Sequence, residues 1–138
     1  MRIDMHHGGL AAAFLASLVL LLTTAVAWAG DDPSIKGDLR TNIQAAMDDF
    51  VTDQSVGGVV RIYDPVEGRL LKLESYELHS GIVRKGDFYV SCADFADQDG
   101  RKIDVDFLVL PDASGKLRAT QGIVHSVDGD KRKYHLEK

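Results

Sequence analysis

Hydrophobic residues recur at helical spacing between residues 31 and 52. The recurring positions lie three or four residues apart: Ile35, Leu39, Ile43, Ala46 and Phe50. This spacing predicts one amphipathic helix that ends around Thr52, before a pair of glycines. Its start has two possible positions. Asp32 can cap the helix with Pro33 in the first turn, or the helix can begin near Asp38, because Gly37 weakens a helical turn.

After residue 58 the pattern changes to short apolar runs separated by Asp, Gly and Pro, which is typical of strands and tight turns. The predicted strands cover residues 59–63, 69–78, 88–95, 102–110, 117–127 and 132–136. The stretch from His79 to Gly86 is either a loop or a continuation of the second strand. The short, regular connections predict an antiparallel meander.

Alternation along the strands predicts which residues face the core. In the fourth strand the odd-numbered positions are apolar, whereas Asp104 and Asp106 lie on the other face. By the same parity, Cys92 in the third strand and His125 in the fifth are predicted to face inward. A sheet with one apolar face needs a cover, and the predicted helix has the apolar stripe to provide it. The sequence therefore predicts an α+β fold in which one N-terminal amphipathic helix packs on a curled antiparallel sheet of five to six strands.

The first 29 residues have the features of an export signal. An apolar run from Leu10 ends at Ala27-Trp28-Ala29, a small-x-small sequence followed at once by polar residues. We expect residues 1–29 to be a signal peptide cleaved before Gly30, and residues 30–138 to form a single α+β domain in the periplasm or outside the cell. After cleavage no stable membrane anchor is expected; the alternative is a segment retained as an anchor.

Charge and cysteine content narrow the possible partners. The formal net charge is −5, so nucleic acid is not an expected partner, because phosphate binding draws on concentrated positive charge. Cys92 is the only cysteine, which excludes an intramolecular disulfide. The fold is therefore expected to depend on core packing.

The segment Gln54-Ser55-Val56-Gly57-Gly58 matches the Gln-x-Val-x-Gly loop of cystatins, which also lay a helix across an antiparallel sheet. In cystatins this loop joins two strands, whereas here it follows the helix directly. The only tryptophan, Trp28, lies in the predicted leader, so the Pro-Trp hairpin of cystatins is missing. We interpret the segment as a helix terminator.

Residues 57–74 resemble the hairpin of PepSY-type exported modules, in which a helix precedes a strand, a D-x-x-x-G turn and a second strand. Asp64 and Gly68 occupy the two ends of that turn. The resemblance implies a periplasmic accessory or inhibitory module and supplies no catalytic residues. The additional strands after residue 86 depart from the short PepSY pattern.

Several residues could take part in catalysis or metal binding, and each also has a purely structural explanation. Cys92 would be a nucleophile if a histidine activated it, but in a meander the fourth strand separates it from His125, so a buried thiol acting as a small hydrophobe is the simpler interpretation. His79, His125 and His135 lack the paired spacing of a metal site. The run Asp97-Gln98-Asp99-Gly100 resembles part of a calcium loop, yet a hairpin turn explains it.

Two charged groups are also given structural interpretations. Asp104 and Asp106 are predicted to lie on a solvated outer face, with Arg118 and Thr120 as cross-strand partners. The run Lys131-Arg132-Lys133 is expected on the final strand, where charge discourages pairing with other chains.

These features are compatible with more than one function. We expect an exported, non-enzymatic accessory or binding module that recognises a protein or a small ligand, with no cofactor. Cys92 and His125 are the candidate ligand-binding residues, and no catalytic or metal-binding residue is assigned. One alternative is a small enzyme with an interior histidine or acid as general base. Another is a metal- or cofactor-handling accessory protein that uses Cys92 or the histidines.

Overall fold

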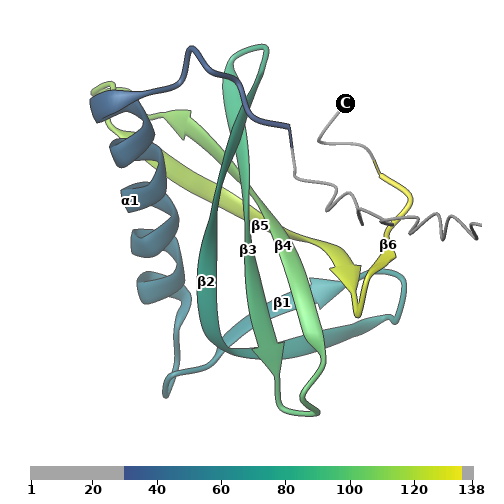
Figure 1. Cartoon of the computed structure of the whole chain (residues 1–138). Helices are drawn as coiled ribbons and strands as arrows, with labels where there is room; N and C mark the ends of the chain where they lie inside the picture. Colours follow the sequence, from purple (N-terminus) through teal and green to yellow (C-terminus); the bar gives the residue numbers. More distant parts are fainter. Residues whose placement is uncertain (1–29, 135–138) are drawn as a thin grey trace, which may run out of the picture.

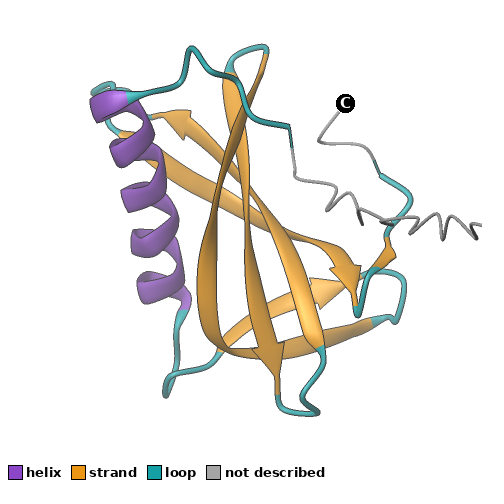
Figure 2. Ribbon diagram, in the orientation of Figure 1, coloured by secondary structure: helices purple, strands orange, loops and turns teal. Residues whose placement is uncertain are grey.

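The computed structural model describes residues 30–134, so the predicted signal peptide lies outside the described residues. One helix, α1 (Gly37–Gln54), precedes six strands in chain order: β1 (Val60–Asp64), β2 (Arg69–Lys85), β3 (Phe88–Asp97), β4 (Lys102–Pro111), β5 (Leu117–Val127) and β6 (Asp130–Lys131). The strands form one antiparallel sheet in the order β1-β2-β3-β4-β5-β6, and α1 lies along one face of it (Figures 1 and 2). The predicted α+β fold with a curled antiparallel sheet is confirmed.

The helix begins at the later of the two predicted positions. Gly37 is the first residue of α1 and has a φ of +57°, so right-handed helical dihedral angles begin at the next residue, Asp38. Asp32 lies instead in a separate turn, where its carboxylate accepts a hydrogen bond from the Ser34 backbone N–H. The helix ends at Gln54, and Gly57 and Gly58 follow with positive φ, as expected of a terminator.

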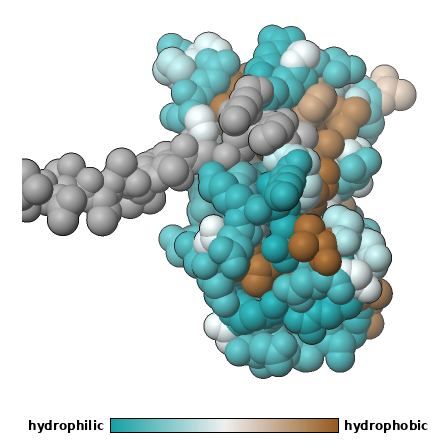
Figure 3. Space-filling view, turned by 90° about the vertical axis from the view of Figure 1, so that its right-hand side faces the viewer, coloured by the Kyte–Doolittle hydropathy of each residue, from teal (hydrophilic) through white to brown (hydrophobic). Residues whose placement is uncertain are grey.

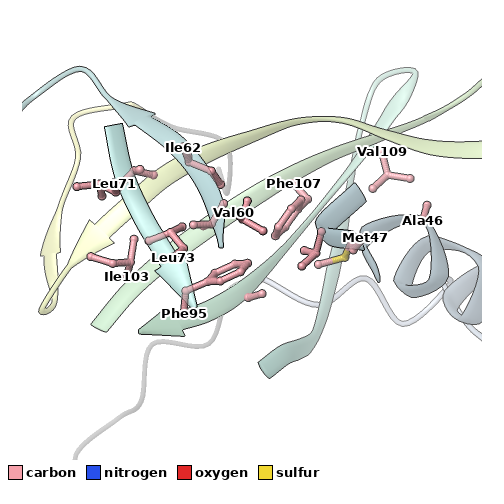
Figure 4. Close-up of a cluster of buried hydrophobic side chains, with 14 of the residues drawn as sticks. Ala46, Met47, Val60, Ile62, Leu71, Leu73, Phe95, Ile103, Phe107 and Val109 are labelled. Carbon is pink, nitrogen blue, oxygen red and sulfur yellow. The ribbon is translucent and has the colours of Figure 1, made fainter. Parts of the chain in front are cut away.

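The core fills the space between α1 and the sheet. The helix buries Ile43, Ala46, Met47 and Val51. Phe107 of β4 lies at the centre of this core, with its ring 5.6 Å from the Phe50 ring of α1 and 6.3 Å from the Phe95 ring of β3, measured between centroids. Figure 4 shows the helix side chains Ala46 and Met47 on the same side of the sheet as Phe107 and Val109. Burial of this apolar surface is the main favourable term in the stability of the fold.

The sheet curls so strongly that β1 approaches β5, although β2, β3 and β4 lie between them in the order of the sheet (Figure 1). Gly122 of β5 permits the close approach. A Cβ atom at this position would lie 3.0 Å from Ile62 Cδ1 and 3.3 Å from Val105 Cγ1. The absence of a side chain therefore lets β1 pack over β5.

Two predictions about the faces are wrong. Cys92 lies opposite Asp106, whereas the core side of β3 carries Ala93 and Phe95, because the middle of β3 is buried on both faces and has no simple alternation. In β5 the pairing with β4 shifts twice, once before Val109 and once before Asp104. Each shift is a β-bulge that changes the parity, so His125 faces away from α1 while its neighbour Val124 faces the core.

The bounds of the second and last strands also differ from the predicted ranges 69–78 and 132–136. The stretch from His79 to Gly86 continues the second strand as far as Lys85, which was one of the two predicted possibilities. The final strand covers only Asp130 and Lys131, rather than residues 132–136, of which 135 and 136 lie outside the described residues. Arg132, just after β6, donates its backbone N–H to the His125 carbonyl of β5, and its side chain forms a buried ion pair with Asp64 of β1.

Figure 3 shows the side of the molecule that carries β6 and the turn between β1 and β2. Most of this surface is hydrophilic, and hydrophobic residues occupy limited areas. The large hydrophobic side chains that are exposed on the described part of the molecule are Val56, Tyr63, Val66, Leu70 and Tyr76. Three of them belong to the β1–β2 hairpin, in which Tyr63 pairs with Leu70 and Val66 lies in the turn.

Candidate metal centre

Four neighbouring strands carry polar side chains on the face of the sheet that points away from α1. We call this group the outer-face cluster; it consists of His79 of β2, Cys92 and Asp94 of β3, Asp104 and Asp106 of β4, and His125 of β5. The pairing of β3 with β4 places Cys92 opposite Asp106 and Asp94 opposite Asp104. Directly opposite residues lie close together, about 4.5 to 5.5 Å between Cβ atoms, so the register itself assembles the middle of the cluster.

A bulge in β2 brings His79 to Cys92. Leu78 pairs with Ala93 and Ile82 pairs with Ser91, so three residues of β2 oppose Cys92 alone. The bulge is anchored from outside the strand, since Arg40 of α1 donates a hydrogen bond to the Ser80 carbonyl. Bulges are common where a strand must redirect a functional side chain.

His79 contacts two members of the cluster through its two ring nitrogens. Nδ1 lies 2.8 Å from Cys92 Sγ, and Nε2 lies 2.9 Å from Asp94 Oδ2. Lys102 Nζ lies 2.7 Å from the same Asp94 oxygen. Burial by itself would raise the pKa of Asp94, but the hydrogen bonds from Lys102 and His79 outweigh it and leave the pKa below its ordinary value. Asp94 is therefore an ionised group that orients the His79 ring.

The environment of Asp104 disfavours the ionised form of its carboxyl group. Burial raises the pKa of Asp104 to about 6, with further upward contributions from the neighbouring carboxylates Asp106 and Asp94, which the histidines only partly oppose. One ligand atom from each of His79, Cys92 and Asp104 lies within 4.8 Å of the other two. These are an imidazole nitrogen, a sulfur and a carboxylate oxygen.

Asp106 and His125 form a second, more deeply buried part of the cluster. Only 1% of Asp106 and 8% of His125 are exposed. His125 Nδ1 lies 2.9 Å from Asp106 Oδ2. The β5 bulge that turns His125 away from the core is what makes this contact possible.

The three carboxylates of the cluster share an unusual feature. Among residues 30–134, one buried oxygen of each of them has no hydrogen-bond partner: Asp94 Oδ1, Asp104 Oδ1 and Asp106 Oδ1. A buried polar atom without a partner costs roughly 1–3 kcal/mol, so native structures rarely leave three in one place. A bound cation would compensate the negative charge of all three, and Asp104 is the one of them that converges with other potential ligand atoms.

The structure changes the roles that the sequence indicated for individual residues. Cys92 is buried as predicted, but it lies beside His79 rather than among apolar core residues. The prediction of a solvated Asp106 is wrong, because the bulge-shifted β5 places Ile123 and Ser126, not Arg118 and Thr120, opposite Asp106 and Asp104. 

Asp94, Asp104 and Asp106 were not predicted as site residues, and His79 was considered only as one of the histidines of the metal-handling alternative. The i, i+2 spacing of the two β4 aspartates was the one signal in the sequence that pointed toward them. His79 could not be found in that way, because its place depends on a bulge whose position the local sequence does not specify.

The run from Asp97 to Gly100 is a hairpin turn, as predicted. Asp97 Oδ1 accepts hydrogen bonds from the backbone N–H groups of Asp99 and Arg101, and Asp97 Oδ2 is paired with the Arg101 side chain at 2.8 Å. Its carboxylate is thus fully used within the turn.

A cavity of about 600 Å³ lies between α1 and the ends of the β2–β3 and β4–β5 hairpins. Leu39 and Ala46 of the helix line it together with Tyr89 and Leu117 of the sheet, and exposed Arg84, Asp49, Asp87 and Lys116 stand around it. The enzyme alternative requires His125 or a buried acid in a pocket between helix and sheet. His125 is not among the residues that line this cavity, and it lies on the opposite face of the sheet.

Comparison of the chain with known protein families, with curated proteins and with solved structures gives no match. Within residues 30–134, no helix has the length and apolar character needed to cross a membrane. The chemistry of the outer-face cluster is therefore the main guide to function.

Proposed function

We propose that the protein is an exported, non-enzymatic binding module whose ligand is a divalent transition-metal ion, held by His79, Cys92 and Asp104. The observation that supports this most directly is that ligand atoms of these three residues, from three different strands, lie within 4.8 Å of one another. A metal ion with bonds of about 2.0–2.3 Å to nitrogen, oxygen and sulfur fits among atoms at such separations.

The mixture of donor atoms favours Zn²⁺. Zinc accepts imidazole nitrogen, thiolate sulfur and carboxylate oxygen together, whereas Ca²⁺ and Mg²⁺ require oxygen ligands. Binding also compensates the buried negative charge, since burial is the main cause of the raised pKa of Asp104 and the two histidines oppose it only in part. Asp94 supports the site from outside by fixing the His79 ring, in the arrangement usual for metal-bound histidines.

Export rests on the sequence of residues 1–29, with its apolar run and its Ala27-Trp28-Ala29 exit. An accessory role accords with the resemblance to PepSY-type modules. N-terminal sequencing of the protein isolated from an exporting host tests this part: the expected first residue is Gly30, and a protein that starts at Met1 would contradict it.

Calorimetric titration of the purified, chelator-treated and reduced protein with zinc tests the site. We expect one equivalent of zinc to bind, and excess Mg²⁺ or Ca²⁺ not to compete. Cys92→Ser should weaken binding by more than the roughly 10- to 100-fold that loss of an outer-shell partner costs. Asp87→Asn, in the exposed turn between β2 and β3, is the matched control and should bind as the unaltered protein does. Equal zinc affinity of the Cys92→Ser variant would overturn the proposal.

A second candidate function follows from the alignment of Cys92, His79 and Asp94, which resembles a thiol nucleophile with a base and an orienting acid. Against it, only 1% of Cys92 is exposed, so a substrate would have difficulty reaching the sulfur. Alkylation of the metal-free protein by iodoacetamide separates the two: rapid modification at neutral pH favours the nucleophile, and slow modification favours the metal site.

A further inference from the structure

The three ligands of the proposed site leave one position of a tetrahedral zinc ion undetermined. In structural zinc sites a fourth protein ligand fills this position, whereas catalytic sites keep it for water or substrate. The identity of the fourth ligand therefore decides whether the bound ion is inert or can activate water.

Asp106 is placed to fill that position. It is the direct cross-strand partner of Cys92, so the two side chains leave neighbouring positions on the same face of the sheet. Only 1% of Asp106 is exposed, and in the described part of the chain its Oδ1 atom has no hydrogen-bond partner. A buried carboxylate oxygen with this surrounding is a ready ligand for a cation.

His125 holds the Asp106 carboxylate in place, as outer-shell partners do for metal-binding carboxylates. His125 Nδ1 is 2.9 Å from Oδ2 and occupies that oxygen, which leaves Oδ1 for the ion. The arrangement repeats the one at His79, whose ring is fixed by Asp94 at 2.9 Å. Each half of the cluster thus pairs a residue that can bind the ion with one that positions it.

Resting on the proposed metal site, we infer that Asp106 supplies the fourth ligand and that His125 positions it, so that the ion is enclosed by protein ligands alone. Asp106 is not among the atoms that lie within 4.8 Å of one another, so its side chain must rotate toward Cys92 when the ion binds. A site closed in this way has no bound water to ionise. It retains or sequesters the ion and does not catalyse hydrolysis.

Cobalt substitution tests the inference, because the visible spectrum of Co²⁺ reports both the sulfur ligand and the coordination number. The Co²⁺-loaded protein is expected to show a thiolate charge-transfer band, intense d–d bands of four-coordination, and no spectral change on addition of azide. Asp106→Asn should keep the thiolate band but lose d–d intensity, and azide should then alter its spectrum. Asp106→Glu should restore part of the intensity.

His125→Gln tests the positioning residue. It should weaken zinc binding by about 10- to 100-fold while the thiolate band remains, as expected for loss of an outer-shell partner. Asp87→Asn again serves as the control, with circular dichroism to confirm that each variant is folded.

Two results would overturn the inference while leaving the site itself in place: an azide-sensitive spectrum of the unaltered protein, or an Asp106→Asn spectrum identical to it. The azide experiment needs no variant, so it remains decisive even if Asp106→Asn does not fold. A Co²⁺-loaded protein without a thiolate band would instead refute the metal site at Cys92, and with it this inference.

Discussion

The two faces of the sheet are buried in very different ways. The face toward α1 is filled with apolar side chains, with Phe107 at its centre and fully buried. The outer face instead has buried polar and charged side chains, among them Asp106, which is 1% exposed. The same two strands, β3 and β4, form both surfaces.

Buried carboxylates occur on both faces of the described sheet, but they differ in whether both of their oxygens have hydrogen-bond partners. On the core side, both carboxylate oxygens of Asp64 accept hydrogen bonds, from the Val66 backbone and from Arg132. On the outer face, one oxygen each of Asp94, Asp104 and Asp106 is left without a partner. Burial without compensation opposes stability, and this contrast is the reason why we propose the binding site on the outer face.

The largest expected effect is on the core face. Phe107→Ala removes a fully buried ring that contacts Phe50 and Phe95, and should lower the free energy of unfolding by about 3–5 kcal/mol. Urea denaturation of the metal-free protein measures it, with Leu70→Ala, at a position that is 58% exposed, as the control. A loss below about 1 kcal/mol would show that the core does not depend on this ring.

The helix, the meander and the strand positions could be predicted because each follows from local patterns. Spacing of Ile43 and Ala46 indicated the helix face, and the alternation from Ile103 to Val109 indicated the core side of β4. The outer cluster could not be derived in this way. It depends on bulges near His79 and His125, and a bulge reverses parity without a strong local signal. Burial of β3 on both faces also hid the side to which Cys92 belongs.

A smaller effect is expected where a charge meets the core face. Arg132→Met leaves the Asp64 carboxylate buried at 0% exposure without its ion-pair partner, which should cost about 3 kcal/mol. Thermal unfolding at pH 7 measures the loss. The double variant with Asp64→Asn should recover part of it, because the uncompensated charge is then gone. If the double variant is as unstable as Arg132→Met, the cost arises from packing and not from charge.

The smallest predicted effect is a gain in the free energy of unfolding rather than a loss. Asp104→Asn replaces a carboxylate whose pKa burial raises from 3.8 to about 6, so in the metal-free protein at pH 7 the variant should be more stable, by about 1–3 kcal/mol. A raised carboxyl pKa means that the native form is favoured below pH 3.8 and loses that advantage as the pH rises through about 6. 

The gain from Asp104→Asn should therefore largely vanish at pH 3.5, where the carboxyl is neutral in the folded chain and mostly neutral in the unfolded chain. Melting temperatures of variant and parent, measured from pH 3.5 to 8 with a chelator present, test this dependence. An equal difference across the whole range would mean that the substitution acts through packing. A gain confined to high pH, together with lost zinc binding, would show that Asp104 reduces the stability of the metal-free fold and is retained for the ion.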